Sequence, residues 1–165
     1  MTARKLTTLG LLTGLALIIF IVELRLPDLT PIPGVKLGLA NIITVYAVFR
    51  FKPSEAVMLV AARIILGSIF SGNFTALIYS AAGAFLCLAG MLSIRKLIPQ
   101  KMIWLASMIG AVLHNTGQIL MAVAVMRTTA VIGYLPILVF SGCVAGLFTG
   151  LTAQIVIYRF DKAIK

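Results

Sequence analysis

The sequence predicts an all-α integral membrane protein, a single domain of about six transmembrane helices that covers residues 1–165. Its mean hydropathy is +1.13 and only 11% of its residues are charged, whereas soluble domains are about one-quarter charged. A helix needs roughly 20 residues to cross about 30 Å of hydrocarbon. Six spans therefore use nearly the whole chain, and no room is left for a soluble catalytic domain.

Six apolar runs carry this prediction. The first follows Arg4 and Lys5, as in a secretory signal, but no small-residue cleavage site comes after it, so we expect a retained span. The second and third are short for full spans, and we expect them to include flanking residues, to tilt little or to be partly broken. The runs are residues 6–22, 37–49, 56–70, 74–92, 102–126 and 135–158.

Two connections have clear signals. Residues 23–36 contain three prolines and Gly34, which break a continuous helix and predict a long loop able to cover a site. Ser71, Gly72 and Asn73 predict a tight turn that makes the third and fourth runs an antiparallel hairpin.

The distribution of Lys and Arg predicts the orientation, because basic residues near span ends accumulate on the cytoplasmic side. With the N-terminus inside, ten basic residues are cytoplasmic and three are outside, and Arg63 lies within a span. Both termini are therefore expected in the cytoplasm. The inner residues are Arg4, Lys5, Arg50, Lys52, Arg95, Lys96, Lys101, Arg159, Lys162 and Lys165, and the outer ones are Arg25, Lys36 and Arg127.

Polar residues inside the spans indicate a binding site, because ionisable groups in lipid usually face the bundle interior or a cavity. Arg63 lies near the middle of the third run; it either serves an interior site or extends its long side chain outward. His114, Asn115 and Gln118 lie within about one turn of the fifth run. They line a polar cavity or, alternatively, join helices by hydrogen bonds.

We expect an outward-facing pocket for an anionic or carbonyl-rich ligand, because the fixed charges of Lys36 and Arg63 favour such a ligand over a cation. The predicted ligand-binding residues are Lys36, Asn41, Arg63, Asn73, His114, Asn115 and Gln118.

Glycines at four-residue spacing form two smooth helix faces that allow another helix to approach closely. They are Gly10 and Gly14 in the first run, and Gly142, Gly146 and Gly150 in the sixth. Each face either packs inside the bundle or docks a partner membrane protein, and all five glycines are candidate partner-docking residues.

Several functions are disfavoured. Glu23, Asp28, Glu55 and Asp161 are scattered and form no cluster for Mg²⁺, and no phosphate-binding G-x-x-x-x-G-K-[ST] loop is present. Cys87 and Cys143 lie in apolar runs without metal-ligand spacing, so no metal site is expected. The charge of +10 lacks the aromatic-interleaved surface typical of nucleic-acid binding. We therefore expect neither an enzyme nor a nucleic-acid-binding protein.

Three segments resemble one family over nearly the whole chain: IPGVKLGLANI at residues 32–42, RIILGSIFSGNF at 63–74 and GAVLHNTGQ at 110–118. The family is called Gx transporter, and is also labelled heptaprenyl diphosphate synthase component I. Its members resemble the substrate-binding S components of energy-coupling-factor transporters. The resemblance implies a bacterial plasma membrane, binding of a small molecule from outside, and docking to an ATP-driven module.

Family members also resemble a membrane component of flavin-based extracellular electron transfer. That resemblance implies the alternative of a flavin or quinone held by the mid-span polar groups. A third, weaker hypothesis is a structural subunit that positions a partner. The residues themselves name no cofactor.

Overall fold

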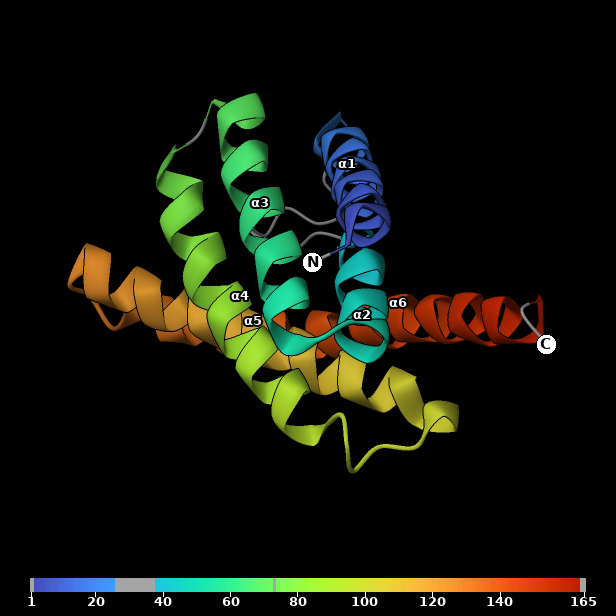
Figure 1. Cartoon of the computed structure of the whole chain (residues 1–165). Helices are drawn as coiled ribbons and strands as arrows, with labels where there is room; N and C mark the ends of the chain where they lie inside the picture. The colour runs from blue at the N-terminus through green and yellow to red at the C-terminus, as the bar shows by residue number, and fades with distance from the viewer. Residues whose placement is uncertain (1, 26–37, 73, 164–165) are drawn as a thin grey trace.

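The chain is helical throughout the residues that the computed structural model describes, 2–25, 38–72 and 74–163 (Figure 1). Six α-helices and two short 3-10 helices follow one another, and no strand occurs among these residues. The elements are α1 (Ala3–Arg25), α2 (Asn41–Arg50), α3 (Pro53–Ser71), α4 (Phe74–Ile94), η1 (Gln100–Met102), α5 (Ile103–Met126), η2 (Ala130–Tyr134) and α6 (Leu135–Ala163).

Five of the six α-helices are long and apolar enough to cross a membrane, and α2 is the exception. The expected short third run is a continuous helix of 19 residues, because Pro53 and Ser54 extend it at its N-terminal end. By contrast, α2 has ten residues, which cover roughly 15 Å at 1.5 Å per residue. The predicted bundle of about six helices is therefore confirmed, and the described residues form five helices long enough to span a membrane and one half-length helix.

Local chemistry explains where α2 and α3 begin and end. Gly38 has a φ of 65° and Gly72 a φ of 66°, the left-handed region that glycine adopts without a steric penalty. The first precedes α2 and the second ends α3. At the start of α3, a Glu55 carboxylate oxygen accepts the Lys52 N–H at 3.0 Å, so one unpaired helix-end donor is satisfied.

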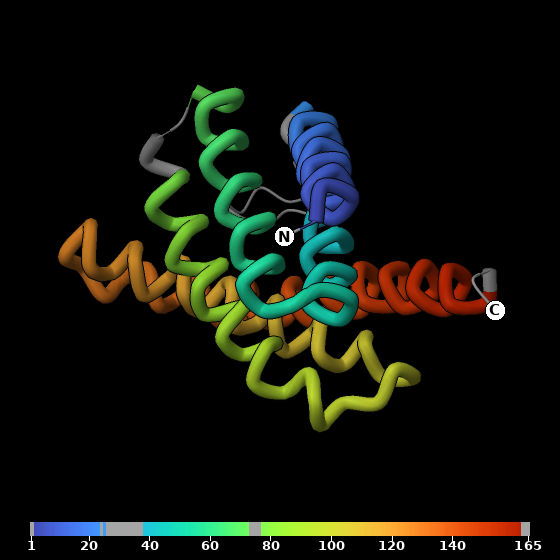
Figure 2. Tube along the Cα trace, in the orientation of Figure 1, coloured from blue at the N-terminus to red at the C-terminus, as the bar shows by residue number. Residues whose placement is uncertain are grey.

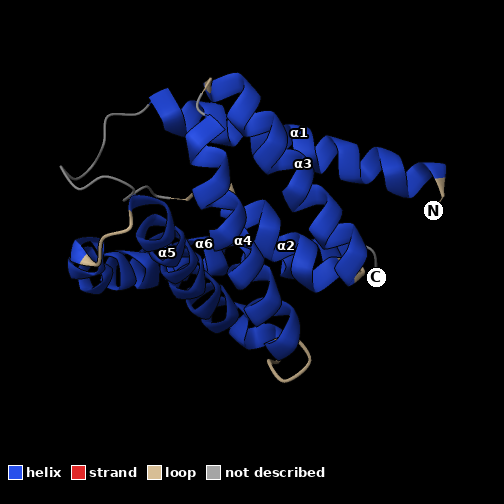
Figure 3. Ribbon diagram, turned by 90° about the vertical axis from the view of Figure 1, so that its left-hand side faces the viewer, coloured by secondary structure: helices blue, strands red, loops and turns tan. Residues whose placement is uncertain are grey.

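The long helices form two neighbouring pairs, α1 with α3 and α5 with α6, and α4 contacts both pairs. Figure 1 shows α5 and α6 side by side, with α4 crossing α5 and α3 next to α4. Figure 2 shows the same path, with α4 running from α3 to α5. In the side view of Figure 3, α1 and α3 lie on one side of the molecule and α5 and α6 on the other. The predicted hairpin is present as α3 and α4, although Asn73 in its turn lies outside the described residues.

Small residues bring α5 and α6 together. A Cβ atom at Gly146 would lie 2.7 Å from the Met108 Cα, and one at Gly150 would lie 2.6 Å from the Trp104 Cα. Gly142 faces the Asn115 side chain in the same way. The glycine face of α6 therefore packs against α5, which is the alternative of packing inside the bundle. Gly10 and Gly14 have no neighbour within 4 Å of such a Cβ among the described residues.

Large apolar side chains cover the outside of the helices. Leu11 is 71% exposed, and Phe85 and Phe140 are each 73% exposed. A soluble protein of this size rarely leaves so much contiguous apolar surface in water. Lipid covers these side chains, and the chain is a multi-span membrane protein.

Ion pairs gather several helix ends at one end of the bundle. The Lys5 Nζ lies 3.1 Å from a Glu55 carboxylate oxygen, which joins the start of α1 to the start of α3. The Arg50 guanidinium lies 2.6 Å from the Asp161 carboxylate, which joins the end of α2 to the end of α6. We call this region the inner end. Both termini of the described chain are near it, and its cytoplasmic location remains the prediction from Lys and Arg.

Candidate functional site

The half-length helix α2 creates a helix N-terminus inside the membrane. Its last residue, Arg50, lies at the inner end, and its first, Asn41, lies nine residues earlier, roughly 14 Å deeper. Arg63 lies ten residues after the first residue of α3, at a similar depth of roughly 15 Å. Because α3 is 19 residues long, both side chains belong to the middle of the membrane.

Arg63 and Asn41 are hydrogen-bonded to each other. The Arg63 Nη1 donates to the Asn41 Oδ1 at 3.2 Å, and the bond is partly buried. Asn41 is neutral, and Arg63 forms no salt bridge with any carboxylate of the described residues. A guanidinium carries five N–H donors, so most of its hydrogen-bonding capacity is not used by the Asn41 Oδ1. The Arg63–Asn41 pair thus places a half-buried cation without a salt bridge at mid-depth.

Glu23 of α1 binds the backbone just before the α2 N-terminus. This residue is 8% exposed, and its Oε1 accepts a hydrogen bond from the Gly38 backbone N–H just before α2. The carboxylate satisfies a donor that would otherwise be unpaired in lipid. Glu23 forms no ion pair with Arg63 within the described chain.

The predicted polar group on α5 is divided between two neighbours. His114 and Gln118 face α4, because a Cβ at Gly83 would lie 3.0 Å from the His114 Cε1 and 2.9 Å from the Gln118 Cγ. Asn115 faces α6 instead, and its Nδ2 donates to the Leu138 carbonyl. Asn115 therefore joins two helices, which is the alternative that the sequence left open, while His114 and Gln118 pack at a close helix crossing.

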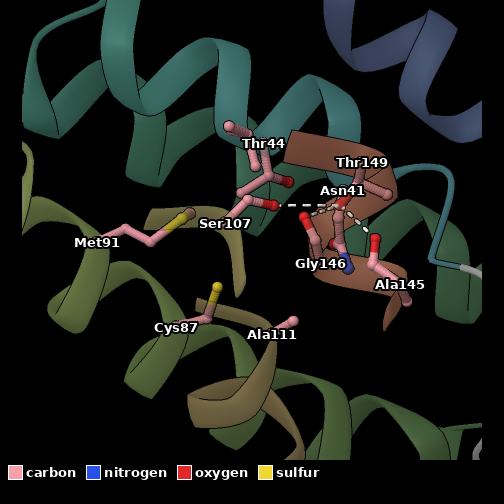
Figure 4. Close-up of a pocket in the computed structure, with 10 residues that line it drawn as sticks. Asn41, Thr44, Cys87, Met91, Ser107, Ala111, Ala145, Gly146 and Thr149 are labelled. Carbon is pink, nitrogen blue, oxygen red and sulfur yellow. Dashed lines mark hydrogen bonds between the residues drawn. The ribbon is translucent and has the colours of Figure 1, made fainter. Parts of the chain in front are cut away.

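A polar cavity of about 30 Å³ lies between α2, α4, α5 and α6 (Figure 4). Four side chains with oxygen atoms line it, from three helices: Asn41, Thr44, Ser107 and Thr149. Cys87 and Met91 of α4 cover its other side. We call this space the hydroxyl cavity. Asn41 is the one predicted site residue among its lining side chains, so this residue connects the cavity to Arg63.

The remaining predicted site residues are Lys36 and Asn73. Both lie outside the described residues, as does Asp28 in the long loop. Of the seven predicted ligand-binding residues, the structure brings Asn41 and Arg63 into direct contact.

Comparison with known proteins identifies the family. The model of the family described as heptaprenyl diphosphate synthase component I matches residues 12–156, which is most of the chain. The chain belongs to this family. No curated protein and no solved structure matches it.

The name of the component I family suggests chemistry on diphosphates, which in general needs carboxylates that hold Mg²⁺. Within the described residues, no group of three or more His, Cys, Asp or Glu side chains is positioned to hold a metal ion. Three carboxylates are described, and each already has a partner: Glu23 binds the Gly38 N–H, Glu55 binds Lys5, and Asp161 binds Arg50.

Three residues that line the cavity were not predicted from the sequence: Thr44, Ser107 and Thr149. Thr44 follows Asn41 by three residues and Ser107 precedes His114 by seven, so each shares a helix face with a residue that was singled out. Thr149 stands between two of the α6 glycines that face α5. These spacings are the available signal, but hydroxyl side chains in lipid are common and most bond their own helix.

Proposed function

We propose that this member of the component I family binds a small anionic or carbonyl-rich molecule from the outer side of the membrane. By analogy with S components, it then acts in uptake or translocation together with partner subunits. The chain has no nucleotide-binding loop, so an ATP-driven partner would have to supply the energy. We assign no polyprenyl diphosphate synthesis to it.

One observation carries the proposal: the charge of Arg63 at mid-depth is held by a neutral amide and by no ion pair of the described chain. A charged side chain at the membrane centre costs roughly 3 kcal/mol on insertion scales, so it usually serves a ligand or an ion path. A planar guanidinium binds carboxylate and phosphate oxygens in a bidentate manner. Arg63 therefore suits an anionic group better than any other ligand chemistry.

The N-terminus of α2 adds to this preference. Unpaired N–H groups and the helix dipole favour negative charge at the start of a helix. In membrane transporters, half-length helices direct such ends at anionic substrate groups. Here Asn41 is both the first residue of α2 and the partner of Arg63, so the helix dipole and the guanidinium charge lie together. The N–H groups of Asn41 and Ile42 are themselves bonded to the Gly38 and Leu39 carbonyls, so the dipole and the charge carry this preference.

The geometry also limits where the ligand lies. Small-molecule pockets are usually about 300 Å³ or larger, so the hydroxyl cavity of about 30 Å³ is too small. Helix α2 begins at mid-depth and does not itself occupy the outer half of the membrane above Asn41. We place the ligand on this outer side of the Arg63–Asn41 pair.

Native mass spectrometry of protein extracted gently from its own membrane tests the proposal. Wild type should carry a small anionic adduct, and Arg63→Gln should lose it, because glutamine keeps a donor for Asn41 but removes the charge. Arg127→Gln is the matched control, since it removes an exposed cation at the end of α5 and should keep the adduct.

An unchanged adduct in Arg63→Gln would contradict the proposed site. A bound flavin or quinone in the wild-type spectrum would instead favour the electron-transfer alternative.

A further inference from the structure

The Thr44 side chain is the unusual feature of the hydroxyl cavity. Thr44 is 4% exposed, and its Oγ1 has no hydrogen-bond partner within the described chain. Other threonines of the spans bond their own helix: the Thr13 hydroxyl donates to the Leu9 carbonyl at 2.8 Å, and the Thr116 hydroxyl to the Val112 carbonyl at 2.8 Å. A buried hydroxyl without a partner costs about 1–3 kcal/mol, so a hydrogen-bond partner for Thr44 would stabilise the protein.

The opposite wall of the cavity offers a matching acceptor. The Thr149 hydroxyl donates to the Ala145 carbonyl at 2.9 Å, which uses its one proton. In the 3.1 Å contact between Ser107 and Thr149, Ser107 must then be the donor. Both lone pairs of the Ser107 oxygen are left to accept. The cavity thus presents the Thr44 hydroxyl as donor and acceptor and the Ser107 oxygen as acceptor, with the Asn41 amide also in its wall (Figure 4).

The size of the cavity selects the ligand. A water molecule needs roughly 10–15 Å³ of cavity volume and two to four polar partners. The hydroxyl cavity, of about 30 Å³, has room for one or two waters and supplies these partners. A monovalent cation would also suit oxygen atoms, but Arg63 is bonded to Asn41 on the wall of the cavity and would repel it.

We propose that the hydroxyl cavity is a resident water site in the middle of the membrane, in which one or two waters bridge Thr44 on α2 to Ser107 on α5. The site is independent of the ligand proposed for Arg63. It gives the half-length helix α2 a polar contact with the α5–α6 pair at mid-depth, in addition to the Arg50–Asp161 ion pair at the inner end.

Replacing Thr44 with valine tests the site, because a water-filled cavity and a dry one predict opposite changes of the unfolding midpoint. Valine has the same shape but no hydroxyl. If water bridges Thr44, Thr44→Val leaves that water with fewer partners, and the unfolding midpoint should fall by roughly 2–4 °C. Thr44→Ser keeps the hydroxyl and should retain the water. Thr116→Val, which removes a hydroxyl satisfied within its own helix, is the matched control and should change the midpoint less.

A rise of the midpoint in Thr44→Val would overturn the proposal, because removing an unpaired hydroxyl from a dry cavity stabilises a protein. Water-edited solid-state NMR of threonine-labelled wild type in lipid tests the site independently of any stability change. Rapid magnetisation transfer from water to the Thr44 signal, assigned by its loss in Thr44→Ser, supports the site. Transfer no faster than to lipid-facing threonines excludes it.

Discussion

Two cations at the inner end of the bundle form ion pairs, whereas the cation in its middle is bonded to a neutral side chain. At the inner end, Lys5 pairs with Glu55 and Arg50 pairs with Asp161, so each of these cations has a carboxylate. In the middle, Arg63 has the neutral Asn41 side chain. The charges at the inner end connect helix ends, whereas the charge at mid-depth forms no ion pair within the described chain. Stability and binding should therefore respond separately to changes in the two regions.

The largest expected effect lies at the inner end, at Arg95. Its Nη1 donates to the Val48 carbonyl at 2.9 Å and to the Phe51 carbonyl at 3.1 Å, so it caps the end of α2. Arg95→Ala removes both charge-assisted bonds, and we expect a loss of about 3 kcal/mol of unfolding free energy. Thermal unfolding in detergent measures this loss. The neighbouring exposed Lys96 provides the control, since Lys96→Ala should change the midpoint little.

The Arg50–Asp161 pair should give a smaller effect that can be reversed. Arg50→Glu places two carboxylates opposite each other and should lower the unfolding free energy by about 1–2 kcal/mol, a modest value because both side chains are about one-third exposed. Arg50→Glu combined with Asp161→Arg restores opposite charges and should recover most of the loss. A double variant no more stable than the single one would show that the pair does not join α2 to α6.

The Lys5–Glu55 pair should contribute least at the inner end, because the Lys5 side chain is 47% exposed. Lys5→Met should lower the unfolding midpoint slightly at low ionic strength and not at all in high salt, since salt screens exposed charges. Thermal unfolding at two salt concentrations compares the two conditions. A loss that persists in high salt would indicate that Lys5 stabilises the start of α1 through packing.

Most of the fold was predictable because lipid imposes strong constraints on a chain. Hydropathy located all six helices, and the short apolar run after the Pro-rich loop already indicated an incomplete span. The length of α2 was not predictable from hydropathy. The residues before Asn41 are apolar as well, and the helix begins where Gly38 takes a positive φ and Glu23, fifteen residues away, accepts its N–H.

The candidate site was predictable in part. Arg63 was identifiable because an arginine inside an apolar run is rare, but its partner Asn41 comes from another helix. Neighbouring residues on a helix point about 100° apart, so whether Asn115 faces α4 or α6 depends on how the helices pack. Thr44 was missed because nothing in its local sequence distinguishes it from Thr116, which bonds its own helix.

The unfolding midpoint of Arg63→Met in ligand-free protein tests most directly whether the mid-depth charge is held for something outside the chain. Methionine fills a similar volume without a charge. If Arg63 has no structural ion pair, the midpoint should stay the same or rise, as when a buried charge is replaced by an apolar group. A fall as large as that of Arg95→Ala would show that Arg63 stabilises the bundle, and would contradict its role in binding.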